Sequence, residues 1–474
     1  MEIHEIVQKQ REYFSTGATL PVEVRCSALK ALKAQILAEE NELKAALKQD
    51  LNKSGFEAYM AEIGMVLDEL GYAIKHLKGW AKPERVGTPL AQFPSRSFII
   101  KEPYGTALIM APWNYPFLLS IDPLIGAVAA GNCVVLKPSA YAPATSHAMA
   151  TLLAKVFDPA WVTVIEGGRR ENASLLDERF DRIFFTGGMT VGRLVMEKAS
   201  VHLTPVLLEL GGKSPIIVDE SADIPLAARR IAFGKLLNAG QTCVAPDYLL
   251  VQNTVKAALV EELKKQFRAM LGEAPLQNPD YVRIVNRKHF ERLLGLLEGE
   301  ALLCGGGSRA DEVSGWIEPT LVEGSAACKP MQQEIFGPIL PVIGFDNIRQ
   351  AIAFVNEREK PLALYLFTRD KAVELWRRLR ERHHHPPCHP QHGVRRRGLQ
   401  RHGQLPRQAQ LYGLQPREKH GEESLLAGSS HALHALQKGQ RKAAADIPEI
   451  MVLPFKPACA KPRCRLVFYV QKIF

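Results

Sequence analysis

The sequence contains no run of 18 apolar residues, no CxxC pair and no GxGxxG fingerprint after a predicted strand. Without the apolar run we expect no membrane partner, and the acidic N-terminus lacks the apolar core of a secretory leader. The eight cysteines follow neither disulfide nor zinc spacing. We therefore expect reduced thiols, a cytoplasmic location and no metal site.

The length and the charge distribution divide the chain. With 474 residues, of which 46% are hydrophobic and 23% charged, two or three globular domains are expected. The net charge of +10 is uneven, because residues 375–474 hold 19 basic and 6 acidic residues while the rest hold 41 and 44. A basic tail can bind nucleic acid. We assign this tail another origin, described below, and expect no nucleic-acid partner.

The apolar spacing of the first 374 residues predicts an α/β fold. Residues 22–50 and 55–80 have helical periodicity, and residues 83–104 alternate short β-type runs with Pro and Gly, as in an extended hairpin. Strand and helix patterns then alternate from residue 105, and a second such block begins at 208. This alternation favours parallel sheets, which bind ligands at the carboxyl ends of their strands.

Several motifs in a fixed order carry the functional signal. They are APWNYP at 111–116, FFTGGMTVG at 184–192, VLLELGGKSP at 206–215, NAGQTCVAP at 238–246 and EIFGP at 334–338. In this order and spacing they resemble the aldehyde dehydrogenase superfamily, most of all its dimeric class-3 branch. The resemblance covers residues 1–374. It implies oxidation of a small-molecule aldehyde to a carboxylic acid with NAD or NADP, by a homodimer.

The resemblance implies three catalytic residues. Cys243 would attack the aldehyde carbon and form a thiohemiacetal, although a free Cys is otherwise most often a buried small hydrophobe. Such a nucleophile needs a partly exposed site that favours the thiolate. The side-chain amide of Asn114, otherwise an ordinary turn residue, would stabilise the oxyanion together with the backbone N–H of Cys243. Glu209 would activate the water that hydrolyses the thioester.

The same resemblance implies a cofactor site at the turn after residues 184–187. Gly187, Gly188 and Gly192 would let the backbone approach the pyrophosphate at a helix N-terminus. Gly188 and Met189 depart from the usual FTGSTxVG wording, in which Ser and Thr occupy these places.

Four further residues complete the expected cofactor site. Lys137 resembles the lysine that holds the adenosine ribose, and Leu210 belongs to the motif beside Glu209. Glu334 and Phe336 resemble the pair that contacts the nicotinamide ribose and ring. The family commonly has Glu three residues after the lysine, whereas this chain has Ala140. Without that carboxylate a 2′-phosphate meets no repulsion, so we expect NADP to be tolerated.

The expected division of the chain follows from these assignments. Residues 1–80 and 105–207 would form a Rossmann-like dinucleotide-binding domain, and residues 81–104 a bridging arm used in oligomerisation. Residues 208–374 would form the catalytic domain. Residues 375–474 would be an aberrant, disordered basic tail, because they lack periodicity and are rich in His and Pro.

A change of reading frame explains the tail better than metal or nucleic-acid binding. If each codon of residues 393–408 is shifted by one base, GVRRRGLQRHGQLPRQ can become AFGGVGCSGMGSYHGK, which resembles the family's C-terminal motif. Residues 375–392 shift to another expected family segment, and a stop codon can fall at Ile450. We infer a frameshift near residues 372–376. The alternative to an active enzyme is therefore an inactive product of a damaged aldehyde dehydrogenase gene.

Overall fold

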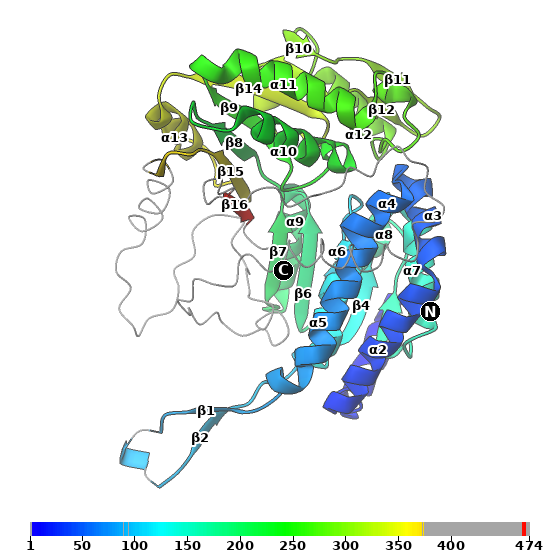
Figure 1. The fold of residues 1–474 in the computed structure, drawn as a ribbon. Helices are drawn as coiled ribbons and strands as arrows, with labels where there is room; N and C mark the ends of the chain where they lie inside the picture. The colour runs from blue at the N-terminus through cyan, green and yellow to red at the C-terminus, as the bar shows by residue number, and fades with distance from the viewer. Residues whose placement is uncertain (1, 89, 93, 372, 374–466, 471–474) are drawn as a thin grey trace, which may run out of the picture.

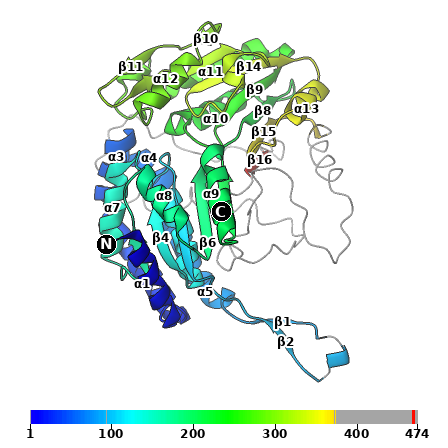
Figure 2. The ribbon, with the colours of Figure 1, turned by 180° about the vertical axis from the view of Figure 1, so that it is seen from behind.

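The computed structural model describes residues 2–88, 90–92, 94–371, 373 and 467–470. These residues form two α/β layers, each consisting of one sheet with its helices, and a projecting hairpin (Figures 1 and 2). The predicted α/β class is confirmed. In the described ranges every helix is too short or too polar to cross a bilayer.

The first layer is built on a five-stranded, wholly parallel sheet in the order β5-β4-β3-β6-β7. Its strands are β3 (Thr106–Met110), β4 (Cys133–Lys137), β5 (Val162–Val164), β6 (Arg182–Gly187) and β7 (Val206–Leu210). Strands β3 and β4 are buried along their whole length, which explains their unbroken apolar runs. Chain order reverses between β3 and β6, so the carboxyl ends of these two strands form the expected ligand crevice.

Helices cover both faces of this sheet. They are α1 (Ile3–Ser15), α2 (Val22–Ala38), α3 (Glu40–Leu51), α4 (Gly55–Ala58), α5 (Gly64–Trp80), α6 (Leu118–Ala130), α7 (Pro143–Ala154), α8 (Arg169–Asp177) and α9 (Met189–Val201). A π-helical turn, Tyr59–Ile63, joins α4 to α5. The single helix expected over residues 22–50 is two helices, because Glu39 leaves helical geometry at φ −108° and ψ 24°.

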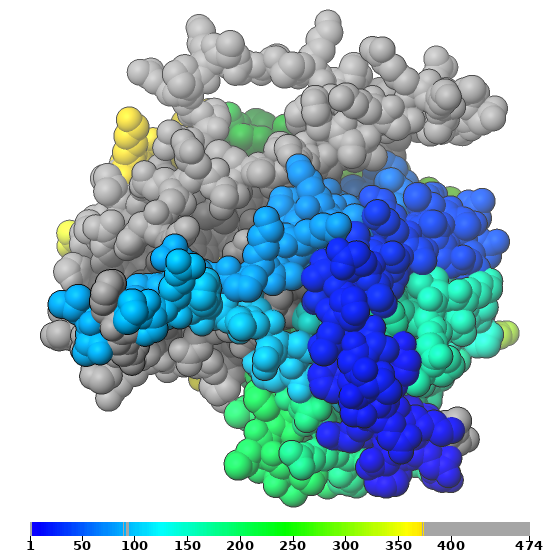
Figure 3. All heavy atoms as spheres, turned by 90° about the horizontal axis from the view of Figure 1, so that it is seen from below, coloured from blue at the N-terminus to red at the C-terminus, as the bar shows by residue number. Residues whose placement is uncertain are grey.

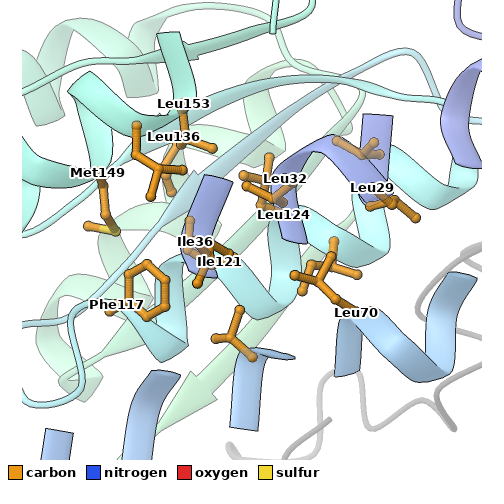
Figure 4. Packing of buried hydrophobic residues seen from close by; sticks show 14 of the residues in the cluster. Leu29, Leu32, Ile36, Leu70, Phe117, Ile121, Leu124, Leu136, Met149 and Leu153 are labelled. Atoms are coloured by element: carbon orange, nitrogen blue, oxygen red, sulfur yellow. The ribbon is translucent and has the colours of Figure 1, made fainter. Parts of the chain in front are cut away.

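The largest apolar core lies between helices α2, α5 and α6 and the five-stranded sheet (Figure 4). Leu32 of α2, Leu70 of α5 and Leu124 of α6 are fully buried there. Phe117, immediately before α6, is also fully buried in this cluster. The chain between β3 and α6 is therefore fixed at its helical end by the core.

The second layer is built on a seven-stranded sheet in the order β10-β13-β14-β9-β8-β15-β16. Its strands are β8 (Ser214–Val218), β9 (Pro246–Gln252), β10 (Leu302–Cys304), β13 (Thr320–Glu323), β14 (Ile339–Phe345), β15 (Ala363–Phe367) and β16 (Val467–Val470). The five central strands are parallel, and both edge strands are antiparallel. The layer also contains α10 (Ile224–Leu236), α11 (Asn253–Leu271), α12 (Arg287–Gly295), α13 (Ile348–Asn356) and the hairpin β11 (Ser308–Ala310) and β12 (Gly315–Ile317).

The boundary between the two layers differs from the expected one. The division expected between residues 207 and 208 falls inside β7, which pairs with β6 in parallel as far as Leu210. The hydrogen-bond ladder keeps the whole of β7 in the first sheet. By sheet membership, the second layer begins after Leu210.

The hairpin expected over residues 83–104 is present and projects from the body. Strands β1 (Glu84–Val86) and β2 (Ser97–Ile99) pair antiparallel, and the hairpin reaches sideways beyond the N-terminal helices (Figure 3). Leu90, Phe98 and Ile100 are 88%, 52% and 68% exposed. Large apolar side chains gathered on a projecting arm mark a contact surface.

One part of the tail departs from the expectation of disorder. Residues 467–470 form β16, which pairs antiparallel with β15 and occupies the edge of the second sheet. The unpaired backbone of an edge strand is a strong template for another strand. The expectation is therefore wrong for these four residues. The rest of the expected tail, and the segment inferred to be frameshifted, lie outside the described residues.

Candidate active site

At the junction of the two sheets, the carboxyl ends of strands in the first sheet lie near the amino ends of strands in the second. Asn114 follows the carboxyl end of β3, Glu209 lies near the carboxyl end of β7, and Gly187 ends β6. Cys243 comes three residues before the amino end of β9, and Glu334 five residues before that of β14. Figure 1 shows the second sheet above the ends of β6 and β7. The topology therefore brings segments of both layers to one junction.

The loop that carries Asn114 is tied directly to the loop that carries Cys243. The buried Asn114 amide donates from Nδ2 to the carbonyl of Gln241 at 3.0 Å. Asn238 Nδ2 donates to the Asn114 carbonyl at 2.9 Å, and the hydroxyls of Tyr115 and Thr242 hydrogen bond at 2.7 Å. The Asn114 side-chain amide is thus held at Gln241, which precedes the proposed nucleophile by two residues in the chain.

The approach to Cys243 has an unusual backbone. Asn238, Ala239 and Gly240 have φ of 53°, 51° and 71°, all in the left-handed region that only Gly enters without cost. A Cβ on Gly240 would lie 2.3 Å from the carbonyl oxygen of Gly337. The loop therefore packs directly on the segment that contains Glu334. Strain at such a site is consistent with a functional constraint on the backbone.

Cys243 is half-buried and its thiol is free. Burial, with smaller contributions from Glu334 and Glu209, raises its pKa to about 12. The structure therefore does not favour the thiolate in the way that the sequence-based assignment requires. Because the thiol keeps its proton at neutral pH, attack on a carbonyl needs a base close by.

Glu209 has the protonation properties of that base. It is 8% exposed on β7, and burial raises its pKa to about 7. A base whose pKa lies near the working pH is both available and strong enough to take a proton. The Glu209 carboxylate also adds a little to the raised pKa of the Cys243 thiol.

Glu334 is held by backbone contacts at the same junction. Gly212 N donates to Glu334 Oε1 at 3.0 Å, and a Cβ on Gly211 would lie 2.1 Å from Oε2. Burial raises the pKa of Glu334 to about 7. The Arg292 guanidinium donates to the carbonyl of Ile335 at 2.6 Å, which fixes the following residue as well.

Phe336 lies next to the Asn114 loop. Its φ of 51° is left-handed, and its ring meets that of Trp113 edge to face at a centroid distance of 5.3 Å. A non-Gly residue in this conformation carries backbone strain. Phe336 therefore connects the segment before β14 with the loop after β3.

The turn expected at residues 184–192 runs from β6 directly into α9. Gly188 caps the helix, and nothing lies within 4 Å of a Cβ built there. The first N–H groups of a helix have no acceptor within it and bind anions well. A Cβ on Gly192 would lie 2.7 Å from buried Leu210, so α9 packs closely on β7. These features fit a pyrophosphate.

Lys137 lies at the carboxyl end of β4 and is buried. Its ammonium donates to the carbonyls of Pro138 and Gly167, each at 2.7 Å. Burial lowers its pKa, although Glu171 and Glu166 oppose that shift. The ammonium is thus fixed beside the crevice, and Ala140, three residues later, provides no carboxylate. In the described part of the chain no three His, Cys, Asp or Glu side chains are grouped for a metal ion.

Sequence reasoning missed the residues that hold the Asn114 loop. Lys53 and Glu62 are fully buried, and each bonds to the segment between β3 and α6. Nothing in a helical stretch with ordinary charges distinguishes them. Asn238 and Gln241 could have been singled out, because they stand beside Cys243 in the motif.

Known proteins with similar sequences and folds agree on one family. The profile of the Aldehyde dehydrogenase family matches residues 1–381. The chain is 47% identical to the Staphylococcus aureus 4,4'-diaponeurosporen-aldehyde dehydrogenase over 76% of this chain and 79% of that protein. It is 44% identical to the dog dimeric NADP-preferring aldehyde dehydrogenase, over 79% of this chain and 82% of the relative.

Solved structures show the same similarity. Substrate-bound AldH of Staphylococcus aureus superposes with a TM-score of 0.78 at 45% identity, covering 80% of this chain and 83% of that one. Indole-3-acetaldehyde dehydrogenase of P. syringae, solved with NAD+, has a TM-score of 0.72 at 26% identity, with coverages of 79% and 78%. Several curated relatives are family 3 members. From the profile, the relatives and the fold together, this chain belongs to the aldehyde dehydrogenase family.

Proposed function

We propose that this chain oxidises an aldehyde to a carboxylic acid through a covalent intermediate on Cys243, with NAD or NADP as cofactor. The observation that carries the proposal is the junction of the two sheets. There a protonated thiol and a fixed amide donor come from two loops, and a carboxylate with a pKa of about 7 comes from strand β7.

The chemistry begins with attack by Cys243. As the sulfur attacks the aldehyde carbon, Glu209 takes the thiol proton, because burial leaves that thiol undissociated at neutral pH. The carbonyl oxygen becomes an oxyanion, which Asn114 Nδ2 and the Cys243 backbone N–H stabilise. The product of this step is a thiohemiacetal.

The second half of the reaction releases the acid. The bound nicotinamide ring supplies the acceptor for the hydride that leaves the thiohemiacetal carbon. The carbon is then a thioester. Glu209 releases the thiol proton to solvent, and the ionised carboxylate then removes a proton from the water that attacks the thioester. Loss of the Cys243 sulfur as leaving group gives the carboxylic acid and, after protonation, the free thiol.

The cofactor would lie across the carboxyl ends of the first sheet. Gly188 and the start of α9 would hold the pyrophosphate, and Lys137 the adenosine ribose. Glu334 and Phe336, from the other layer, would contact the nicotinamide end. Because Ala140 provides no charge against a 2′-phosphate, we propose that both NAD and NADP are accepted.

The projecting hairpin supports a homodimer. Its exposed Leu90, Phe98 and Ile100 need a partner surface, and a second copy of this chain would supply one. The dog relative is named as dimeric.

The test is turnover by the 474-residue chain. Hexanal and NAD should give NADH, and the Cys243→Ala variant should not. A second version, in which the family reading frame is restored after residue 374, distinguishes the rival proposal. If only the restored version is active, this chain is the inactive product of a frameshifted gene, and sequencing the locus should show the lost frame.

A further inference from the structure

We propose that Lys53 and Glu62 are positioning residues for the oxyanion donor Asn114, and that their buried ion pair fixes the loop from which Asn114 donates. The inference rests on the proposed function, because it gives Asn114 a role in the reaction. The two charged residues lie outside both the turn between β6 and α9 and the loop that carries Cys243.

The pair lies in the first layer, in the turn of chain that precedes α5. Lys53 follows α3, and Glu62 belongs to the π-helical turn Tyr59–Ile63. Both side chains are 0% exposed, and Lys53 Nζ donates to Glu62 Oε1. A single π-helical turn within a helix is often found at functional sites, because the extra residue changes where side chains point.

Glu62 holds one end of the Asn114 loop. Its Oε2 accepts hydrogen bonds from the backbone N–H groups of Phe117 at 2.9 Å and Leu118 at 3.1 Å. Leu118 is the first residue of α6, whose N–H groups lack helical partners and favour a negative charge. The carboxylate is therefore bound by the start of α6, while the Phe117 ring is fixed in the core (Figure 4).

Lys53 holds the middle of the same loop. Its ammonium donates to the carbonyl of Asn114 at 2.9 Å and lies 4.2 Å from the centre of the Tyr115 ring. Asn238 Nδ2 donates to the same carbonyl at 2.9 Å. Two donors, one of them charged, thus fix the peptide plane after Asn114.

Glu57, from the same stretch of chain, holds the opposite loop. Its Oε1 accepts from the backbone N–H of Asn238 at 2.7 Å, where the backbone is left-handed. The stretch from Lys53 to Glu62 therefore contacts both loops that meet at Cys243. This stretch contributes no atom to the reacting groups proposed above. It can affect the reaction only by fixing the positions of the loops that carry them.

Stability alone is a weak reason for this arrangement. Two charges removed from water lose hydration that their attraction hardly restores, and well-packed apolar residues often replace such pairs without loss. Positioning is a stronger reason. An oxyanion donor is effective only where the charge develops, and a displacement of about 1 Å can cost about a hundredfold in rate.

The test uses the paired variant Lys53→Met, Glu62→Gln in the 474-residue chain. Replacing both charges avoids an unpaired buried charge, and Gln keeps an acceptor for the start of α6. The matched control is Lys44→Met, Glu40→Gln, which removes another Lys–Glu pair of the same helical region whose ammonium lies 5.4 Å from the Tyr59 ring. Thermal unfolding of both variants shows whether they fold.

The first readout is binding of hexanal without cofactor, measured as protection of Cys243 from iodoacetamide by peptide mass spectrometry. Thiohemiacetal formation needs the oxyanion donor, so the paired variant should need at least about tenfold more hexanal, whereas the control should match the parent. In an Asn114→Ala background the paired substitution should add less than about twofold. Full additivity with Asn114→Ala would overturn the proposal, because a general structural effect does not act through Asn114.

The second readout does not need aldehyde binding. Hydrogen exchange of residues 111–118 should be faster in the paired variant than in the parent and the control. If the parent shows no aldehyde protection of Cys243, the proposed function fails, while faster exchange still supports the positioning role. Unchanged exchange in this segment would overturn that role whatever the aldehyde result.

Discussion

The two sheets provide different kinds of residue to the junction between them. The five-stranded sheet presents the carboxyl ends of its strands, followed by regular turns into helices such as the one at Gly188. The seven-stranded sheet presents amino ends, reached through loops with left-handed residues at Asn238, Ala239 and Phe336. In the proposed function the first sheet would bind the cofactor, and the second carries the strained loop of Cys243. The proposed reaction therefore depends on the contacts that hold the two sheets in place relative to each other.

The largest effect should come from the nucleophile of the second sheet. Cys243→Ala removes the group that forms both covalent intermediates, and we expect kcat to fall by at least about ten-thousandfold. NADH formation with hexanal measures it. A variant that keeps a tenth of the activity would show that Cys243 is not the nucleophile.

The next effect should come from the first sheet's contribution to the oxyanion. Asn114→Ala should lower kcat by about a hundred- to a thousandfold, because one positioned donor is lost. The KM for the cofactor should change much less, because Asn114 makes none of the proposed cofactor contacts. If the substitution weakened cofactor binding as much as it lowered kcat, the loop between β3 and α6 would have lost its structure.

The pH dependence should follow Glu209. With a pKa of about 7, the base is protonated below neutrality, so kcat/KM should fall about tenfold per pH unit there. The folded pKa lies above its ordinary value of 4.5, so protonation stabilises the fold. That stability is present in full below pH 4.5 and is lost as the pH rises through 7. Glu209→Gln should therefore raise the unfolding temperature at pH 8 but not at pH 4. An unchanged unfolding temperature at pH 8 would contradict the burial of this carboxylate.

The edge of the second sheet gives a smaller, structural effect. Phe468→Pro with Tyr469→Pro removes two successive N–H groups, one of which must face β15 in an antiparallel ladder. We expect the unfolding temperature to fall by a few degrees and aggregation to increase, because the β15 edge is exposed. The same pair of prolines would have no effect on either property if β16 did not pair with β15.

Cofactor preference should be the smallest effect. The kcat/KM values with NAD and NADP should lie within about tenfold of each other, because Ala140 leaves the ribose site without a repelling charge. Ala140→Glu should lower the NADP value and leave the NAD value nearly unchanged. Strict NAD preference in the parent chain would count against this reading of the site.

Local sequence patterns predicted most of the fold. The order of apolar residues within a buried strand or an amphipathic helix by itself indicates which element the segment forms. The strands before Asn114 and Lys137 were predicted, as were the hairpin and the turn at Gly188. The break at Glu39 was missed, since helical spacing continues on both sides of it. The strand at 467–470 was also missed, because its order depends on the exposed edge of β15 rather than on its own pattern.

The site was predictable only as far as its motifs reach. The motifs indicated Cys243, Glu209 and Asn114. They did not indicate the direction of the thiol pKa shift, which depends on burial and on two carboxylates that are distant in the sequence. Lys53 and Glu62 carry no local signal at all. Their significance follows from tertiary contacts with residues more than fifty positions later in the chain.

The most direct test of covalent catalysis at Cys243 is a mass measurement on the 474-residue chain, stopped with acid during turnover. Acid protonates Glu209 and stops hydrolysis, so the thioester should be trapped when hexanal and NAD are both present. Peptide mass spectrometry should then find a hexanoyl group on Cys243, and none when NAD is omitted. A Cys243 peptide of unchanged mass, or a hexanoyl group on another cysteine, would contradict the account.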